Sequence, residues 1–225
     1  MVYLYAIADA DAAPPAAAGI DGAPVSVEAV HDLGAVVSVL ARQPSPESQQ
    51  AVLDHARVVE AVARESAAVL PARFGRSYDD AESLRRALEA RAGELRESLE
   101  RVRDCVEVAL RVLAPEQALT SPAASAPAPA ESGQDYMRAR LAAVHDAEAL
   151  ADELHLPLAA LARASTRSVA APRLLLTAAY LVPRGSLPAF RTRVEELQRS
   201  RPGVSLACTG PWPPYSFAAA EAARA

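Results

Sequence analysis

The chain has 225 residues, of which 51% are hydrophobic and 23% charged, a composition typical of globular proteins that fold without disulfides or metals. All 23 basic residues are arginine, and the absence of lysine excludes Schiff-base enzymes and phosphate-binding loops of the G-x-x-x-x-G-K type. A net charge of −5 disfavours a broad nucleic-acid surface, and no apolar stretch approaches the roughly 20 residues of a membrane helix. The N-terminus lacks the basic start of a secretory signal. We therefore expect a cytoplasmic protein with no nucleic-acid or membrane partner.

The chain begins with segments typical of a small sheet. Val2–Ala8 predicts a strand because it is rich in Tyr, Val, Ile and Leu. The β-branched runs Val25–Val30 and Leu33–Leu40 predict a hairpin, since only a short polar break separates them. Gly34 is a candidate β-bulge within it.

Helices are predicted next, followed by a strand. Gln49–Leu70 has apolar residues at helical spacing and ends at Pro71. Asp79–Asp80 starts a second helix, because its carboxylates favour the positive helix end. The apolar stripe of that helix is Leu84, Leu88, Leu95 and Leu99. Cys105–Leu113 alternates with a period of two, which predicts a strand with one buried face.

A change in composition divides the chain. Residues 114–132 are rich in Ala, Pro and Ser and carry too few large apolar side chains to order themselves. We interpret them as a linker between an N-terminal domain, residues 1–113, and a C-terminal domain, residues 133–225.

The C-terminal domain is predicted to alternate helices with strands. The inward stripe of its first helix is Met137, Leu141, Val144, Ala151 and Leu154. The expected elements are helix Asp135–Leu154, a shorter helix after Pro157, strand Leu174–Val182, helix Pro188–Arg199 and strand Val204–Cys208, before a tail expected to be mobile. The fold class is therefore α+β in both modules, with helices covering an antiparallel sheet in the ferredoxin-like manner.

The sequence shows no catalytic constellation. The four histidines lack metal-ligand spacing, and His55 lies on an apolar helix stripe that favours a core role. Both cysteines, Cys105 and Cys208, fall in predicted strands and are expected to be buried. Asp79–Asp80 could bind a divalent cation, but a charge pair at a helix start is favoured. We predict no enzyme, no cofactor and no metal.

Two segments have residue compositions that folding alone does not require. In the first, Phe74 precedes Gly75, which can supply the positive φ of a helix stop. The second is Thr209–Phe217, a proline-rich peptide with the aromatic residues Trp212, Tyr215 and Phe217. Such a peptide either clamps two modules together or forms a recognition surface, and the sequence leaves both open.

These segments, with others spread along the chain, resemble the gas vesicle accessory protein family GvpF/GvpL. The matching peptides are Tyr3–Ile7, Leu33–Ser38, Val58–Glu60 with His55, Val69–Gly75, Cys105–Val108, Gly133–Tyr136, Ala178–Val182 and Thr209–Phe217. The last is the most specific. Arg76 departs from the family pattern, which usually has threonine there.

The resemblance implies a non-enzymatic role in building gas vesicles and two α+β modules, the second modified ferredoxin-like with extra helices. It implies contacts with the hydrophobic shell protein and other accessory proteins during assembly, or retention as a minor component of the vesicle. The candidate residues for partner binding or contact between domains are Phe74, Trp212, Tyr215 and Phe217. An undetected ligand-binding domain or enzyme is the remaining alternative.

Overall fold

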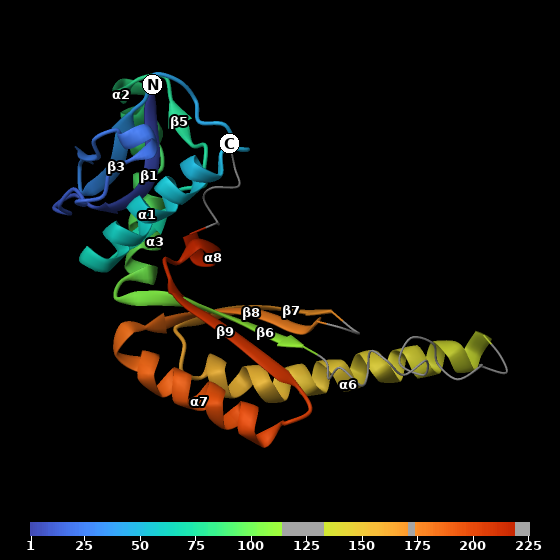
Figure 1. Ribbon diagram of the computed structural model, residues 1–225. Coiled ribbons are helices and arrows are strands. Elements are labelled where there is room, and N and C mark those ends of the chain that lie inside the picture. Colours follow the sequence, from blue (N-terminus) through green and yellow to red (C-terminus); the bar gives the residue numbers. More distant parts are fainter. Residues whose placement is uncertain (114–132, 171–173, 219–225) are drawn as a thin grey trace. The chain divides into compact units, whose positions relative to one another are not determined.

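The computed structural model describes residues 1–113, 133–170 and 174–218 (Figure 1). They form two compact units: Met1–Val106 with Trp212–Ala225, and Glu107–Pro211. Each unit contains one antiparallel sheet covered by helices, which confirms the α+β fold class.

The first unit is built on a five-stranded sheet. Its order is β2-β3-β1-β4, and β5 pairs with β1 outside this path. The strands are β1 (Val2–Asp9), β2 (Ser26–Val30), β3 (Leu33–Val39), β4 (Val69–Pro71) and β5 (Ser77–Tyr78). The helices are η1 (Ile20–Gly22), α1 (Gln49–Glu65), α2 (Ala81–Glu89), α3 (Ala92–Val102) and α8 (Tyr215–Ala218).

The predicted hairpin is present as β2 and β3, but Gly34 is not its bulge. The β2–β3 register is unbroken, whereas the β1–β3 register shifts between Leu4 and Ala6. Gly34 serves a close approach of two strands instead. A Cβ at this position would lie 2.5 Å from the backbone oxygen of Asp9 and 2.9 Å from a methyl group of Val27.

The helix expected over Gln49–Leu70 is five residues too long at its C-terminal end. α1 ends at Glu65, and β4 then pairs with β1, with Leu70 opposite Ile7. Apolar side chains at helical spacing continue into β4, so the pattern alone hides the change from helix to strand. The next predicted helix is two helices, α2 and α3, and all four leucines of its stripe are buried.

Helices cover both faces of the first sheet. Tyr3 and Tyr5 of β1 belong to the core cluster that contains Val58, Val59 and Val62 of α1. Residues of β1 on the other face, Leu4 and Ile7, meet Leu88 of α2 and Leu95 of α3 around a common cavity. β1 is therefore central in a three-layer arrangement, which explains why its side chains are buried on both faces.

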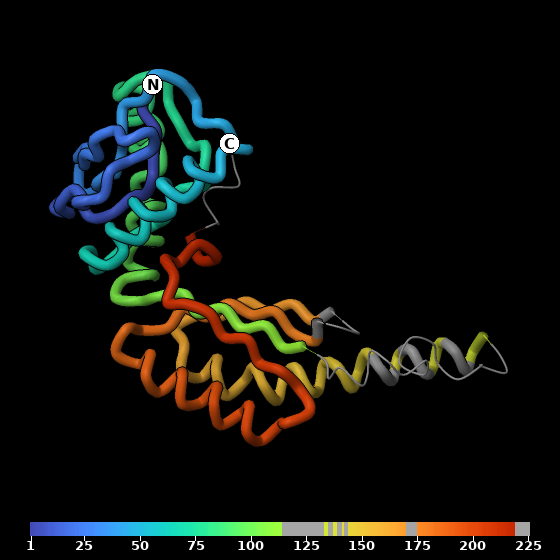
Figure 2. Tube along the Cα trace, viewed as in Figure 1, coloured from blue at the N-terminus to red at the C-terminus, as the bar shows by residue number. Residues whose placement is uncertain are grey.

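The second unit has ferredoxin-like topology. Its elements are β6 (Cys105–Leu113), α6 (Gly133–Ala159), β7 (Ala164–Ala170), β8 (Leu174–Pro183), η2 (Arg184–Ser186), α7 (Leu187–Ser200) and β9 (Ser205–Trp212). The sheet order is β7-β8-β6-β9, so the unit follows the β-α-β-β-α-β pattern. Helices α6 and α7 lie on the same side of the sheet (Figure 2).

The strand β6 belongs to this sheet, although the sequence places it in the N-terminal domain. The predicted linker, residues 114–132, lies outside the described residues. The elements on either side of it, β6 and α6, both belong to the second unit. The ferredoxin-like pattern needs β6 as its first strand, and the alternation of Cys105–Leu113 carries no information on which sheet it joins.

Helix α6 differs from the prediction at both ends. It continues through Pro157 because Leu154 and Leu158 are both fully buried, so packing outweighs the lost backbone hydrogen bond. Three residues of the expected stripe, Met137, Leu141 and Val144, are 50–64% exposed. They lie in the N-terminal part of α6, which extends beyond the sheet (Figure 1).

A matched pair of glycine substitutions tests the close approach at Gly34. Gly34→Ala is expected to lower the free energy of unfolding by about 2–4 kcal/mol, because the new methyl group overlaps backbone atoms of Asp9. Gly93→Ala in α3 is the control, since its Cβ would meet nothing within 4 Å. This substitution should raise stability by up to about 1 kcal/mol. Urea unfolding of both variants is the measurement, and equal stabilities would contradict the strand contact.

Candidate functional site

The aromatic segment lies at the junction of β9 and α8. Trp212 is 45% exposed and Tyr215 is 39% exposed, whereas Phe217 is half-buried. Pro213 and Pro214 between the two exposed rings are buried. The rings therefore extend from a backbone whose φ angles are fixed by two packed prolines.

The expected peptide Thr209–Phe217 is divided between the units. Its residues up to Pro211 belong to the second unit, and those from Trp212 belong to the first. Within the first unit, α8 contacts β4. The chain thus leaves the first unit near Val106 and returns to it at Trp212.

Phe74, the remaining candidate, lies inside an aromatic cluster. Its ring centroid is 6.3 Å from that of Tyr3 and 5.7 Å from that of His55, both in edge-to-face arrangements. Gly75 after it has the expected positive φ, +87°, but it lies in the turn between β4 and β5 and not at a helix stop, because α1 ends at Glu65. The structure therefore packs Phe74 against Tyr3 and His55.

A buried hydrogen-bond network joins β1, α1 and the turn that contains Phe74. The Tyr3 hydroxyl lies 3.0 Å from Nδ1 of His55 and accepts a hydrogen bond from the Gly75 amide at 2.9 Å. Nε2 of His55 lies 3.2 Å from the carbonyl oxygen of Ala72, which can only accept. Nε2 therefore carries the proton, and Nδ1 accepts from the Tyr3 hydroxyl. The neutral imidazole satisfies all of these polar atoms.

Burial shifts the pKa of both titratable groups of this network in the direction that favours the neutral form. It raises the pKa of Tyr3 to about 12, although the Gly75 hydrogen bond acts in the opposite direction. It lowers the pKa of His55 to about 4, against the hydrogen bond to Ala72. Both side chains are neutral near pH 7, so the network is a structural connection of uncharged groups.

The second unit contains a similar pair. Nδ1 of His155 on α6 lies 2.9 Å from the hydroxyl of Tyr180 on β8, and Phe190 packs edge-to-face on Tyr180. Burial lowers the pKa of His155 and raises the pKa of Tyr180. Each unit thus connects a helix to its sheet through a histidine and a tyrosine. The sequence indicates the core role of His55 but does not reveal either partner.

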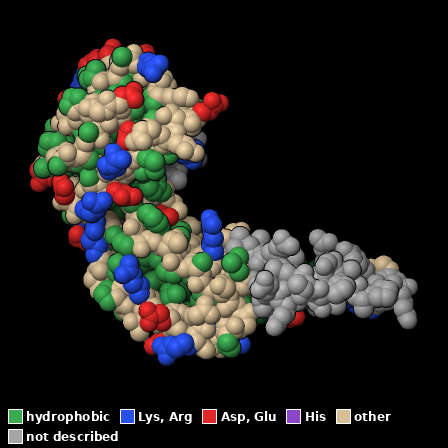
Figure 3. All heavy atoms as spheres, viewed as in Figure 1, with side chains coloured by type: hydrophobic (Ala, Val, Ile, Leu, Met, Phe, Trp, Pro, Cys, Tyr) green, Lys and Arg blue, Asp and Glu red, His purple; other side chains and the backbone are tan. Residues whose placement is uncertain are grey.

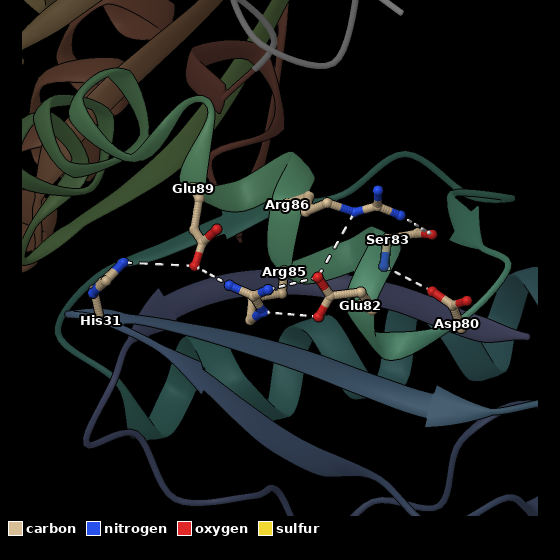
Figure 4. Close-up of polar contacts among 7 residues, drawn as sticks. All are labelled: His31, Asp80, Glu82, Ser83, Arg85, Arg86 and Glu89. Atoms are coloured by element: carbon tan, nitrogen blue, oxygen red, sulfur yellow. Dashed lines mark hydrogen bonds and ion pairs between the residues drawn. The ribbon is translucent and has the colours of Figure 1, made fainter.

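The charged face of α2 is a set of ion pairs (Figure 4). Arg85 bonds both Glu82 and Glu89, and these hydrogen bonds raise the pKa of its guanidinium. The carboxylate of Asp80 accepts a hydrogen bond from the amide of Ser83 at 2.7 Å. Asp80 is therefore the N-cap of α2, which confirms the helix-start interpretation.

Two arginines of the α3 region connect it to the sheet. Both terminal nitrogens of Arg103 lie about 2.9 Å from the carboxylate oxygens of Asp9 at the end of β1. Arg96 pairs with Asp32 in the β2–β3 turn. On the face drawn in Figure 3, arginine and acidic side chains lie among hydrophobic ones.

The described residues contain no group of three histidine, cysteine or acidic side chains placed to hold a metal ion. Among the described helices, none is long and apolar enough to cross a membrane. Cys105 is buried as expected, but Cys208 is exposed because β9 is an edge strand.

The stability of the first unit should depend on pH through His55. An unfolded chain protonates this side chain near pH 6.5 and the folded chain only near pH 4. The unfolded state therefore binds more protons in this interval, so stability is full above it and falls as the pH decreases, by up to about 3 kcal/mol.

Urea unfolding between pH 7 and pH 4 measures this effect. His55→Gln keeps a donor and an acceptor but does not titrate, so its stability should vary less over this range than that of the original chain. His145→Gln on the exposed surface of α6 is the control and should keep the original dependence. An unchanged dependence in His55→Gln would contradict the neutral buried imidazole.

Comparison with known proteins identifies the chain's relatives. The family model described as Gas vesicle synthesis protein GvpL/GvpF matches residues 1–219. The chain is 34% identical to gas vesicle protein L of a Streptomyces species, over 91% of this chain and 87% of that protein. It is 28% identical to gas vesicle protein F2 of Halobacterium salinarum, over 96% of this chain and 91% of that protein.

Solved structures show the same fold. The crystal structure of gas vesicle protein GvpF from Anabaena sp. PCC7120 superposes with a TM-score of 0.79 at 20% identity, covering 96% of this chain and 95% of that one. The crystal structure of gas vesicle protein GvpF from Microcystis aeruginosa superposes with a TM-score of 0.74 at 21% identity, covering 96% of this chain and 98% of that one. The match of the family model over almost the whole length shows that this chain belongs to the GvpL/GvpF family of gas vesicle synthesis proteins.

Proposed function

We propose that this chain is a non-enzymatic assembly factor of gas vesicles, which binds the hydrophobic shell protein and other accessory proteins while the shell forms. A shell protein that polymerises into an apolar wall exposes aggregation-prone surface before it is incorporated. A partner that covers this surface must itself present apolar groups to solvent. The proposed partner-binding surface is the exposed aromatic pair Trp212 and Tyr215.

The observation that carries this proposal is the exposure of these two rings in a family of gas vesicle synthesis proteins. Trp and Tyr are the residues most enriched where protein interfaces gain their energy. The buried prolines between them fix the backbone before a partner arrives, which lowers the entropy lost on binding. Of the other two candidates, Phe74 packs edge-to-face against Tyr3, and Phe217 is half-buried in α8.

The positions of the perturbed titratable groups favour a role without catalysis. His55 and His155 are buried, and each is hydrogen-bonded to a tyrosine. Their pKa values are lowered mainly by burial, and their ring nitrogens face protein groups in the core. A general acid or base needs a proton-transfer path to a substrate.

Retention in the finished vesicle as a minor structural component is the second candidate. An exposed aromatic pair suits a permanent contact as well as a transient one. Recovery with washed vesicles at a fixed ratio to the shell protein would favour this candidate over a transient assembly factor.

Co-expression with the shell protein from the same source tests the proposal. The chain should keep the shell protein soluble and retain it in a pull-down. Trp212→Ala and Tyr215→Ala should each weaken binding about tenfold, as expected when an aromatic interface residue is truncated. Leu53→Ala is the matched control, because Leu53 on α1 is 58% exposed and lies outside the aromatic segment.

Thermal unfolding of each variant must first show that it is folded. Full-strength binding by folded Trp212→Ala and Tyr215→Ala variants would exclude the aromatic pair as the binding surface. Absence of binding and of solubilisation by the original chain would contradict the assembly role itself.

A further inference from the structure

The first unit contains a cavity of about 130 Å³ between its sheet and the helices α2 and α3. Its walls include Leu4 and Ile7 of β1, Leu88 of α2, Leu95 of α3 and Ala218 of α8. The helix that begins at Tyr215 thus supplies part of one wall. The cavity reaches the surface at Arg73, which lines it and is exposed.

The interior of this cavity is apolar. The four side chains Leu4, Ile7, Leu88 and Leu95 are at most 8% exposed. Nearby backbone groups are already paired: the Leu4 amide bonds the Arg76 carbonyl and the Ala72 amide bonds the Tyr5 carbonyl, both at 2.9 Å. A water molecule needs two to four polar partners to be held in such a space. The cavity therefore favours an apolar occupant over water.

Two arginines without a carboxylate partner line the cavity. Among the described residues, no acidic side chain pairs with Arg73 or Arg76. Arg76 donates to the hydroxyl of Tyr78 at 3.1 Å, and its guanidinium lies 5.2 Å from the centre of that ring. By contrast, Arg85 and Arg103 each bond two carboxylates. The chain has 28 acidic against 23 basic residues, so a shortage of acids does not explain the unpaired charge.

The size of the cavity identifies the kind of occupant. Sites for small-molecule ligands usually measure roughly 300–1,000 Å³, well above this volume. An engineered cavity of about 150 Å³ accommodates one benzene molecule. The space therefore fits a single Leu, Ile or Phe side chain and excludes a nucleotide or a fatty acid.

We propose that this cavity is a docking pocket for one apolar side chain of a protein partner, with a carboxylate on the same partner segment paired to Arg73 and Arg76. The apolar walls hold the side chain, and the two unpaired guanidinium groups select a partner segment with an acidic residue beside it. The inference rests on the proposed function, because it takes the partner to be a protein of the same assembly.

The first experiment fills the pocket in the full chain and repeats the pull-down with the shell protein. Ala87 lines the cavity from α2, so Ala87→Leu places a side chain where the partner's would lie. Arg73→Glu reverses the charge at the opening. Each should weaken binding at least tenfold, because a filled pocket excludes the partner side chain and a carboxylate repels the partner's acid.

Two matched variants control this experiment. Ala90→Leu makes the same change at the exposed end of α2, away from the cavity. Arg42→Glu makes the same charge reversal at an exposed loop position. Both should bind as the original chain does. If the original chain binds and all four variants bind equally well, the docking pocket is refuted while the proposed function stands.

A second probe separates failure of the pocket from failure of the proposed function. The probe is 4-methylpentanoate, which combines a leucine-like group with a carboxylate, and the neutral control is 4-methylpentan-1-ol. Methyl NMR signals of Leu88 and Leu95 should shift with the acid at lower concentration than with the alcohol, and not in Ala87→Leu. If the shell protein does not bind, this titration decides alone: no shift with the acid, or equal shifts with both compounds, overturns the proposal.

Discussion

The hydroxyl group of Tyr3 is the contact on which the first unit depends. It pairs with His55 on α1 and with the Gly75 amide, so it connects the central strand, the covering helix and the turn after β4. That turn carries Arg73 and Arg76, which line the cavity on the other face of the sheet. One buried polar group therefore sets the position of elements on both faces. A side chain that is neutral and fully hydrogen-bonded can do this at little cost in desolvation.

The second unit interrupts the first along the chain. The chain leaves the first unit after Val106, near the start of β6, and returns to it at Trp212, the last residue of β9. These two strands are neighbours in the sheet. In the ferredoxin-like pattern the first and last strands lie side by side, so the two connections come close together. This topology explains why the most specific peptide of the sequence is split between units: its first half completes a sheet edge and its second half returns to the first unit.

The sequence predicts local structure well and long-range pairing poorly. The alternation of Cys105–Leu113 identifies a strand, and the leucines of α2 and α3 are all buried as their spacing indicates. The two-residue strand β5 and the strand β7 lack an apolar pattern, so the sequence does not predict them. The sheet that β6 joins depends on contacts with β8 and β9, which no local pattern encodes. For the candidate site, composition identifies the exposed rings Trp212 and Tyr215, whereas the half-buried position of Phe74 follows from its contacts with Tyr3 and His55.

The wall formed by Ala218 has a consequence for biosynthesis. A ribosome delivers the strands of the first sheet early and the segment that begins at Trp212 about a hundred residues later. The ferredoxin-like unit is synthesised in between, and domains generally fold as units in the order in which they emerge. A nascent chain therefore holds an incompletely walled cavity until translation reaches α8. Completion of the cavity wall thus follows synthesis of the ferredoxin-like unit, although every other residue that lines the cavity precedes that unit in the chain.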